Sequence, residues 1–181
     1  DYSAASSGID VNLTSGQATL DGDGGSDTLQ EIQNVIGTVF DDSLVGDAEE
    51  NILSGGSRND TLEGRAGTDT LDGGAGQDTV DYGQAVGAVV VDLAANATTH
   101  DGDGASDTLV LIENVSGSAG ADSITGDSSS NVLFGDDGDD TLIGAGGNDT
   151  LDGGEGIDTV DYSAAGTGVR ASIDAGATTN D

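Results

Sequence analysis

The chain has 181 residues, and its 35 Asp and Glu side chains face only three cationic ones, Arg58, Arg65 and Arg170, giving a formal net charge of −32. This acid excess excludes the basic patches by which proteins bind nucleic acid or anionic membranes, and no apolar run approaches the roughly 18 residues of a membrane span. The 32 glycines without proline or cysteine exclude collagen, a disulfide scaffold and thiolate metal sites, which leaves metal cations as the natural counter-charge.

The chain is built from a long unit that repeats. Residues 1–80 begin with DYSAASSGIDVNL, residues 81–160 begin with DYGQAVGAVVVDL, and a third copy that begins at Asp161 stops at Asp181. We therefore expect further units on one or both sides. The predicted segments are the end of a truncated unit's insert (1–36), a first block of short repeats (37–81), an inter-block insert (82–116), a second block (117–161) and the start of a third unit (162–181).

Each insert contains two strand signals separated by an acidic loop. The predicted strands cover residues 9–13 and 28–36 in the first copy and residues 88–93 and 108–115 in the second. We expect both inserts to add longer coils to the architecture of the blocks. Oxygen ligands alternate with glycine in the loops, as at the start of an EF-hand loop, although the flanking helices and the Glu at position twelve are missing. These loops are either calcium sites or solvated acidic turns, and their carboxylates are Asp21, Asp23 and Asp27 in one copy and Asp101, Asp103 and Asp107 in the other.

The first block, residues 37–81, consists of five nonapeptides. Each begins with Gly and carries an aliphatic residue at its eighth position, Leu44, Leu53, Leu62, Leu71 or Val80, and the sixth positions are Asp42, Asn51, Asp60, Asp69 and Asp78. One aliphatic side chain in each nonapeptide cannot supply the apolar face of a helix, whereas it suits a short strand whose middle residue faces inward. Glycines permit the tight turns between such strands.

The second block, residues 117–161, repeats this pattern. Its eighth positions are Ile124, Leu133, Leu142, Leu151 and Val160, and its sixth positions are Asp122, Asn131, Asp140, Asp149 and Asp158. Each nonapeptide is half a coil of turn, strand and turn, so two successive nonapeptides make one full coil. Both blocks therefore predict an all-β fold, a parallel β-roll or β-solenoid, with a thin aliphatic core.

These nonapeptides resemble the repeats-in-toxin (RTX) motif G-G-x-G-x-D-x-U-x, in which U is a large aliphatic residue. GGAGQDTVD at residues 73–81 and GGEGIDTVD at residues 153–161 match it at every specified position. The resemblance implies that several Ca²⁺ ions lie between neighbouring turns, held by backbone carbonyls and sixth-position carboxylates. The glycines of these turns that it implicates are Gly74, Gly76, Gly138, Gly147, Gly154 and Gly156.

Neighbouring turns on the same edge of such a roll are separated by one full coil, which is two nonapeptides. The resemblance then pairs Asp42 with Asp60, Asp60 with Asp78, Asp122 with Asp140 and Asp140 with Asp158, and on the opposite edge Asn51 with Asp69 and Asn131 with Asp149. Block one departs from the motif, with Phe40, Glu49 and Arg58 at the fourth position and Arg65 at the second. Because a guanidinium would compete with calcium, we expect weaker sites in the first half of block one and the best sites at Asp69, Asp78, Asp140, Asp149 and Asp158.

The sequence offers little for catalysis. His100 is the only histidine, no cysteine is present, and each acidic cluster coincides with a turn, so we expect no enzyme. The resemblance implies an extracellular, type I-secreted protein that folds where calcium is plentiful. We expect a structural extender of a large adhesin, surface-layer or biofilm-matrix protein that is able to self-associate; the alternative is an accessory module of a secreted protease, lipase or alginate epimerase.

Overall fold

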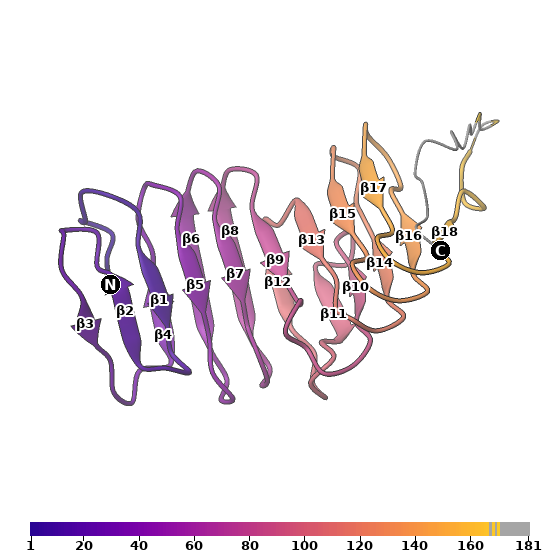
Figure 1. Cartoon of the computed structure of the whole chain (residues 1–181). Helices are drawn as coiled ribbons and strands as arrows, with labels where there is room; N and C mark the ends of the chain where they lie inside the picture. The colour runs from indigo at the N-terminus through magenta and orange to yellow at the C-terminus, as the bar shows by residue number, and fades with distance from the viewer. Residues whose placement is uncertain (167, 169, 171–181) are drawn as a thin grey trace.

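The computed structural model describes residues 1–166, 168 and 170, and this part of the chain contains eighteen short strands and no helix. The strands are arranged along a single axis, with β3 at one end and β18 at the other (Figure 1). The described part accordingly has no helix of the length and apolarity needed to cross a membrane. Most of the predicted third unit, 162–181, lies outside the described residues.

The strands form two nine-stranded sheets. Sheet A contains, in spatial order, β17 (Thr150–Asp152), β15 (Val132–Phe134), β13 (Asn114–Ser116), β9 (Thr79–Asp81), β7 (Thr61–Glu63), β5 (Ser43–Val45), β1 (Asp10–Asn12), β2 (Gln17–Leu20) and β3 (Asp27–Thr28). Sheet B contains β18 (Thr159–Val160), β16 (Thr141–Ile143), β14 (Ser123–Thr125), β10 (Val90–Asp92), β11 (Ala97–His100), β12 (Thr108–Val110), β8 (Thr70–Ala75), β6 (Ile52–Ser57) and β4 (Asn34–Ile36). The sheets do not close on each other.

Successive nonapeptides contribute strands alternately to sheets A and B. Strands in the same sheet pair in parallel with an offset of two nonapeptides, as Leu44 does with Leu62 in sheet A and Leu53 with Leu71 in sheet B. This pairing confirms the predicted coil of two nonapeptides and the predicted β-roll.

The core is a stack of the eighth-position aliphatic side chains. From Leu44 to Leu142 each of these side chains is at most 1% exposed, and together with insert residues they form one buried cluster. Full burial of a Leu side chain stabilises a fold by about 1.5–3 kcal/mol, so these positions dominate the apolar driving force of a sparse core. Leu151 is only partly buried and Val160 is 43% exposed, because no described coil stacks on them.

The insert strands pair with the nonapeptide strands in the same two sheets. Strands β10, β11 and β12 form an antiparallel meander in sheet B, flanked by parallel pairing of β12 with β8 and of β10 with β14. Strand β13 then lies in sheet A between β9 and β15. The boundaries of the five predicted segments remain a prediction, although no break in either sheet separates insert from block.

The predicted single strand over residues 108–115 was wrong. The chain forms β12, turns at Leu111 with a φ of 52°, and crosses to the other sheet as β13. The prediction also missed β11 and its counterpart β2. Each of these strands buries one residue, Thr98 or Ala18, so neither shows the apolar alternation that marks a strand in sequence.

The two inserts place their meanders in opposite sheets. Strands β1, β2 and β3 lie in sheet A, whereas the equivalent β10, β11 and β12 lie in sheet B. The blocks are therefore out of phase, since the first nonapeptide of block one supplies β5 to sheet A and that of block two supplies β14 to sheet B. Asp122, Asp140 and Asp158 precede sheet B strands, and so do Asn51 and Asp69.

Candidate calcium-binding turns

The sixth-position residues form two hydrogen-bonded ladders, one at each edge of the solenoid. In each step the backbone N–H of one sixth-position residue donates to Oδ1 of the sixth-position Asp one coil later. These bonds run from Asp42 to Asp60 (2.8 Å), Asp60 to Asp78 (2.8 Å), Asn51 to Asp69 (2.8 Å), Asp122 to Asp140 (2.7 Å), Asn131 to Asp149 (3.1 Å) and Asp140 to Asp158 (3.1 Å). The structure thus brings together all six pairs that the sequence suggested; their role as metal ligands remains a proposal.

The inserts extend these ladders with residues that the nonapeptide pattern did not assign to them. The N–H of Asp69 donates to Oδ1 of Asp107 (3.1 Å), and the N–H of Asp78 donates to Oε2 of Glu113 (2.9 Å). Sequence reasoning missed Glu113 and placed Asp107 only in a loop. Both precede a residue pair of the form polar then aliphatic, Thr108-Leu109 and Asn114-Val115, which repeats positions seven and eight of a nonapeptide.

The turns fall into two kinds. We call the turns of the first two nonapeptides of each block the leading turns (37–42, 46–51, 117–122 and 126–131) and those of the other three the trailing turns (55–60, 64–69, 73–78, 135–140, 144–149 and 153–158). All six trailing turns place their second residue in the left-handed region, with φ between 61° and 115°, even where that residue is Arg65, Asp136 or Ala145. Second residues of the leading turns do not adopt this conformation.

Four trailing-turn carboxylates each have one oxygen without a hydrogen-bond partner. Oδ2 of Asp60, Asp69, Asp78 and Asp140 is buried and unpartnered, in residues that are at most 1% exposed. Burial raises the pKa of Asp60 and of Asp69 to about 7, and it raises the pKa of Asp78 and of Asp140 as well. A buried carboxylate oxygen without a partner is costly, and a hard divalent cation is the group that satisfies it, so these residues fit calcium.

The predicted glycines bring backbone carbonyls of neighbouring turns close together. Five of them, Gly74, Gly138, Gly147, Gly154 and Gly156, have φ values between 89° and 149°. A Cβ at any of the six predicted positions would collide with a backbone carbonyl of the turn one coil earlier, for example at Gly76 with the carbonyl of Arg58. These carbonyl oxygens are the second class of ligand that calcium accepts.

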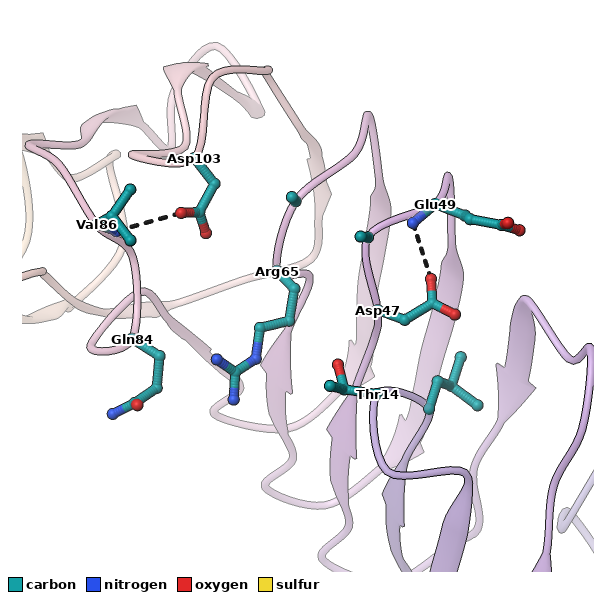
Figure 2. A pocket seen from close by; sticks show the side chains of 10 residues that line it. Thr14, Asp47, Glu49, Arg65, Gln84, Val86 and Asp103 are labelled. Atoms are coloured by element: carbon teal, nitrogen blue, oxygen red, sulfur yellow. Dashed lines mark hydrogen bonds between the residues drawn. The ribbon is translucent and has the colours of Figure 1, made fainter.

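The loop of the second insert is more enclosed than a solvated turn. Asp101 is completely buried; its Oδ1 accepts the N–H groups of Asp103, Gly104 and Ala105 at 2.8–2.9 Å, and its Oδ2 has no partner. Asp107 is 2% exposed and accepts the hydroxyl of Tyr82 at 3.1 Å. Asp103 instead accepts the N–H of Val86 at 3.2 Å (Figure 2).

The first insert repeats these contacts in a more exposed setting. Oδ1 of Asp21 accepts the N–H groups of Asp23 and Gly25 (2.9 Å each), and Asp27 accepts the hydroxyl of Tyr2 (3.1 Å). Asp23 accepts the N–H of Ser6 (3.2 Å). The three predicted carboxylates of each loop therefore have separate partners.

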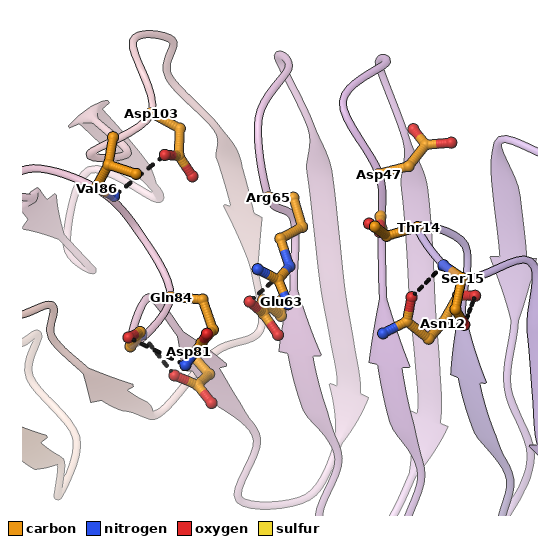
Figure 3. A network of polar contacts seen from close by, with 12 residues as sticks. Asn12, Thr14, Ser15, Asp47, Glu63, Arg65, Asp81, Gln84, Val86 and Asp103 are labelled. Carbon is orange, nitrogen blue, oxygen red and sulfur yellow. Dashed lines mark hydrogen bonds and ion pairs between the residues drawn. The ribbon is translucent and has the colours of Figure 1, made fainter.

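The two arginines of block one contact residues that are not ladder carboxylates. The Arg58 guanidinium lies 5.6 Å from the centre of the Phe40 ring. Arg65 Nε lies 2.8 Å from Glu63 Oε1 as an ion pair without hydrogen-bond geometry (Figure 3). The expected weakness of the calcium sites in the first half of block one remains a prediction. It rested on competition between a guanidinium and calcium, whereas the contacts observed for the two arginines are with Phe40 and Glu63.

A hollow of about 600 Å³ lies beside two turns of one edge (Figure 2). Its lining includes Asp47 and Glu49 from one turn, Arg65 from the next, and Asp103 from the insert loop. Across the described residues, no group of three or more His, Cys, Asp or Glu side chains is arranged as a metal site.

Comparison with known protein families matches the repeat blocks. The model of the RTX calcium-binding nonapeptide repeat (HemolysinCabind) matches four times, at residues 36–57, 45–80, 112–142 and 125–160, which together span more than half of the chain. No curated protein matches the chain.

Proposed function

Because the chain belongs to the RTX calcium-binding nonapeptide repeat family, whose repeats bind multiple calcium ions, we propose that it is a calcium-dependent extender of a large secreted bacterial surface, adhesin or matrix protein. The RTX repeat is a structural calcium-binding module of secreted proteins, not a catalytic one. The finer assignment, an extender exported by type I secretion and folded outside the cell, is the proposal.

The observation that carries this proposal is the continuity of the solenoid across the insert. The edge ladder passes from block one into the insert through Asp69 and Asp107. The core does the same, since Leu71 pairs with Leu109 and Val80 with Val115 in parallel strands. A chain in which each unit stacks on the next transmits load along its axis, and such stacking is how repeat proteins build long rods.

The charge of the chain supplies the calcium dependence. A net charge of −32 destabilises any compact state by self-repulsion, and four buried carboxylate oxygens of the ladders are without partners. Calcium, when bound, supplies the positive charge that these oxygens and the crowded turn carbonyls require. Because the unfolded chain has no formed site, the free energy of ion binding becomes folding free energy.

Circular dichroism during a calcium titration, with magnesium as control, tests the coupling between binding and folding. We expect a disordered spectrum in excess chelator and a β-rich spectrum with calcium. Magnesium should leave the spectrum disordered, because it demands small octahedral sites that carbonyl-rich turns do not provide. A β-rich spectrum in chelator at pH 8 would contradict the proposal.

Single-molecule stretching tests the extender role directly. A chain tethered by its two ends should resist extension in calcium and stretch without a force peak in chelator. Equal compliance under both conditions would contradict a load-bearing extender role.

The alternative is an accessory module of a secreted enzyme such as a protease, lipase or alginate epimerase. The repetition of the long unit, 1–80 and then 81–160, favours the extender, because each unit adds length without adding a new kind of site. A catalytic domain on the same polypeptide would favour the accessory module, whereas many further units would favour the extender.

A further inference from the structure

The leading turns differ from the trailing turns in how they satisfy their sixth-position side chains. In the first leading turn of each block, the second residue donates twice to the carboxylate. Thr38 donates its N–H to Oδ2 of Asp42 (2.6 Å) and its hydroxyl to Oδ1 (2.9 Å), and Ser118 makes the same two bonds to Asp122 (2.6 and 2.8 Å). Both oxygens of each carboxylate are therefore occupied by donors from the same turn.

Oδ1 of these two carboxylates also accepts an N–H from the adjoining insert. The donors are Ile9 for Asp42 (2.9 Å) and Val89 for Asp122 (2.7 Å). The preceding coil thus offers an aliphatic residue in place of a ladder carboxylate, so Asp42 and Asp122 have a carboxylate neighbour only in the coil that follows, at Asp60 and Asp140.

In the second leading turn of each block, an amide group replaces the carboxylate. Nδ2 of Asn51 donates to the carbonyl of Gln33 (3.0 Å), and Nδ2 of Asn131 donates to the carbonyl of Glu113 (2.8 Å). Each acceptor lies one coil earlier, in the neighbouring turn on the same edge. The Oδ1 atoms accept the N–H groups of Asp47 and Asp127 (2.8 and 2.9 Å).

These side chains are buried, and their satisfaction contrasts with that of the trailing turns. Thr38, Asn51, Ser118 and Asn131 are at most 2% exposed. Among the described residues of the two blocks, the sixth-position carboxylates with a buried unpartnered oxygen all belong to trailing turns, at Asp60, Asp69, Asp78 and Asp140. The residues of the leading turns thus do not fit an ion: a cation would have to displace donors already placed on the same oxygens or enter beside an amide that carries its own hydrogens.

We infer that the four leading turns hold no calcium ion, and that the N–H and hydroxyl donors of Thr38 and Ser118 and the amides of Asn51 and Asn131 take the place of the ion. The calcium ions of each block are then confined to its three trailing turns. In block one their ligands also include the carboxylates of the insert that continue the ladders, Asp107 and Glu113. Asp42, Asp122, Asn51 and Asn131, which sequence reasoning grouped with the ligands, act as metal-independent turn residues.

The inference has a structural consequence. Each block begins with a pair of turns that close without calcium, next to the insert that precedes them, and the calcium-dependent turns stack on this pair. The leading turns therefore supply an edge that needs no ion of its own, on which the first trailing turn pairs when its ions bind.

The test counts calcium ions bound to the full chain by native mass spectrometry in calcium-buffered solution. The matched variants are Asp122→Asn and Asp140→Asn, which make the same change at the same nonapeptide position on the same edge, one coil apart. We expect Asp140→Asn to lose at least one ion. We expect Asp122→Asn to keep the wild-type number of ions while its melting temperature in calcium falls, because one Ser118 donor loses its acceptor.

Equal loss of ions by the two variants, or no loss in Asp140→Asn, would overturn the inference. Asp42→Asn and Asp60→Asn repeat the comparison in block one, so a variant that fails to fold leaves the other pair to decide. Ser118→Ala, which removes the hydroxyl alone, should keep every ion and lower the melting temperature; loss of an ion would count against the substitution of hydroxyl for calcium. The inference rests on calcium binding by the chain, and a wild-type chain without bound ions would contradict that premise instead.

Discussion

The sixth-position Asp residues of the trailing turns all use Oδ1 in the same way, to accept the N–H of the residue one coil earlier. Oδ2 is then the atom that decides whether a turn needs a cation. In Asp60 it is buried without a partner, whereas in Asp42 it accepts the N–H of Thr38. The donor to Oδ2 is a backbone N–H, so the backbone conformation of the turn's second residue, left-handed in the trailing turns and not in the leading turns, goes with the difference in ion requirement.

Asn131→Asp should convert a leading turn into a calcium-requiring one. The change removes the amide donor to the Glu113 carbonyl and brings a carboxylate oxygen toward it, an arrangement that costs about 1–3 kcal/mol unless a cation intervenes. We expect a lower melting temperature at low calcium and a steeper rise of melting temperature with calcium concentration than in the wild type.

Asn131→Ala is the control, because it removes the same donor without adding a ligand. Its melting temperature should fall without any gain in calcium dependence. Identical calcium dependence of the Asp and Ala variants would show that the amide does not occupy an ion position.

The raised pKa values of Asp60 and Asp69, about 7, predict a pH effect in excess chelator. Both values lie above the usual value of an unfolded Asp, near 4, so the folded state binds more protons and gains stability at low pH. This contribution is fully present below about pH 4 and is lost as the pH rises through about 7. The chelated chain should hence show more β structure at pH 5.5 than at pH 8.

Calcium should show the opposite dependence on pH, because protons compete for the same oxygens. The calcium concentration at the midpoint of folding, followed by circular dichroism, should fall between pH 5.5 and pH 8. Asp60→Asn and Asp69→Asn should each weaken this dependence, and a midpoint independent of pH would refute the assignment of protons and calcium to shared carboxylates.

At the scale of the elements, each nonapeptide strand contributes one inward side chain to the core. Leu62 of β7 is completely buried, and truncating a fully buried Leu to Ala costs about 2–5 kcal/mol in stability. Leu62→Ala should consequently lower the free energy of unfolding in saturating calcium by an amount in that range, measured by denaturant titration. Ile52→Ala, on the outer face of β6 and 52% exposed, should change it by no more than about 0.5 kcal/mol.

The nonapeptide strands were predictable because their eighth positions recur in register, and the pairing of Leu44 with Leu62 follows from that spacing alone. The insert was predictable only in part. Strand β11 is stabilised by pairing with β10 and β12, not by its own apolar residues. The turn at Leu111 has a left-handed φ at a residue that is not glycine, so the sequence did not indicate it. Similarly, the spacing located the ladder residues but did not show which Oδ2 atoms have partners, since that depends on donors from neighbouring turns.

At the scale of the molecule, the meander adds two strands to one sheet at each insert, and successive inserts do so in opposite sheets. Both sheets consequently reach nine strands over the described chain, and neither outgrows the other. An odd number of nonapeptides between inserts produces this alternation, because each nonapeptide moves the chain to the other sheet. The meander therefore returns to the same sheet only after two of the long units.

Calcium should convert the chain from an expanded coil into a short rod, which small-angle X-ray scattering measures. Nine strands at about 4.8 Å spacing give a solenoid roughly 40 Å long, with a radius of gyration of about 16–20 Å. An unfolded chain of 181 residues has a radius of gyration of about 45 Å, and mutual repulsion of its acidic side chains favours further expansion. Calcium should therefore lower the radius of gyration at least twofold, whereas the same concentration of magnesium should leave most of the chain expanded. A radius of gyration in excess chelator as small as that of the rod would mean that the repeats and their leading turns suffice for the fold, and that calcium is not required to form the rod.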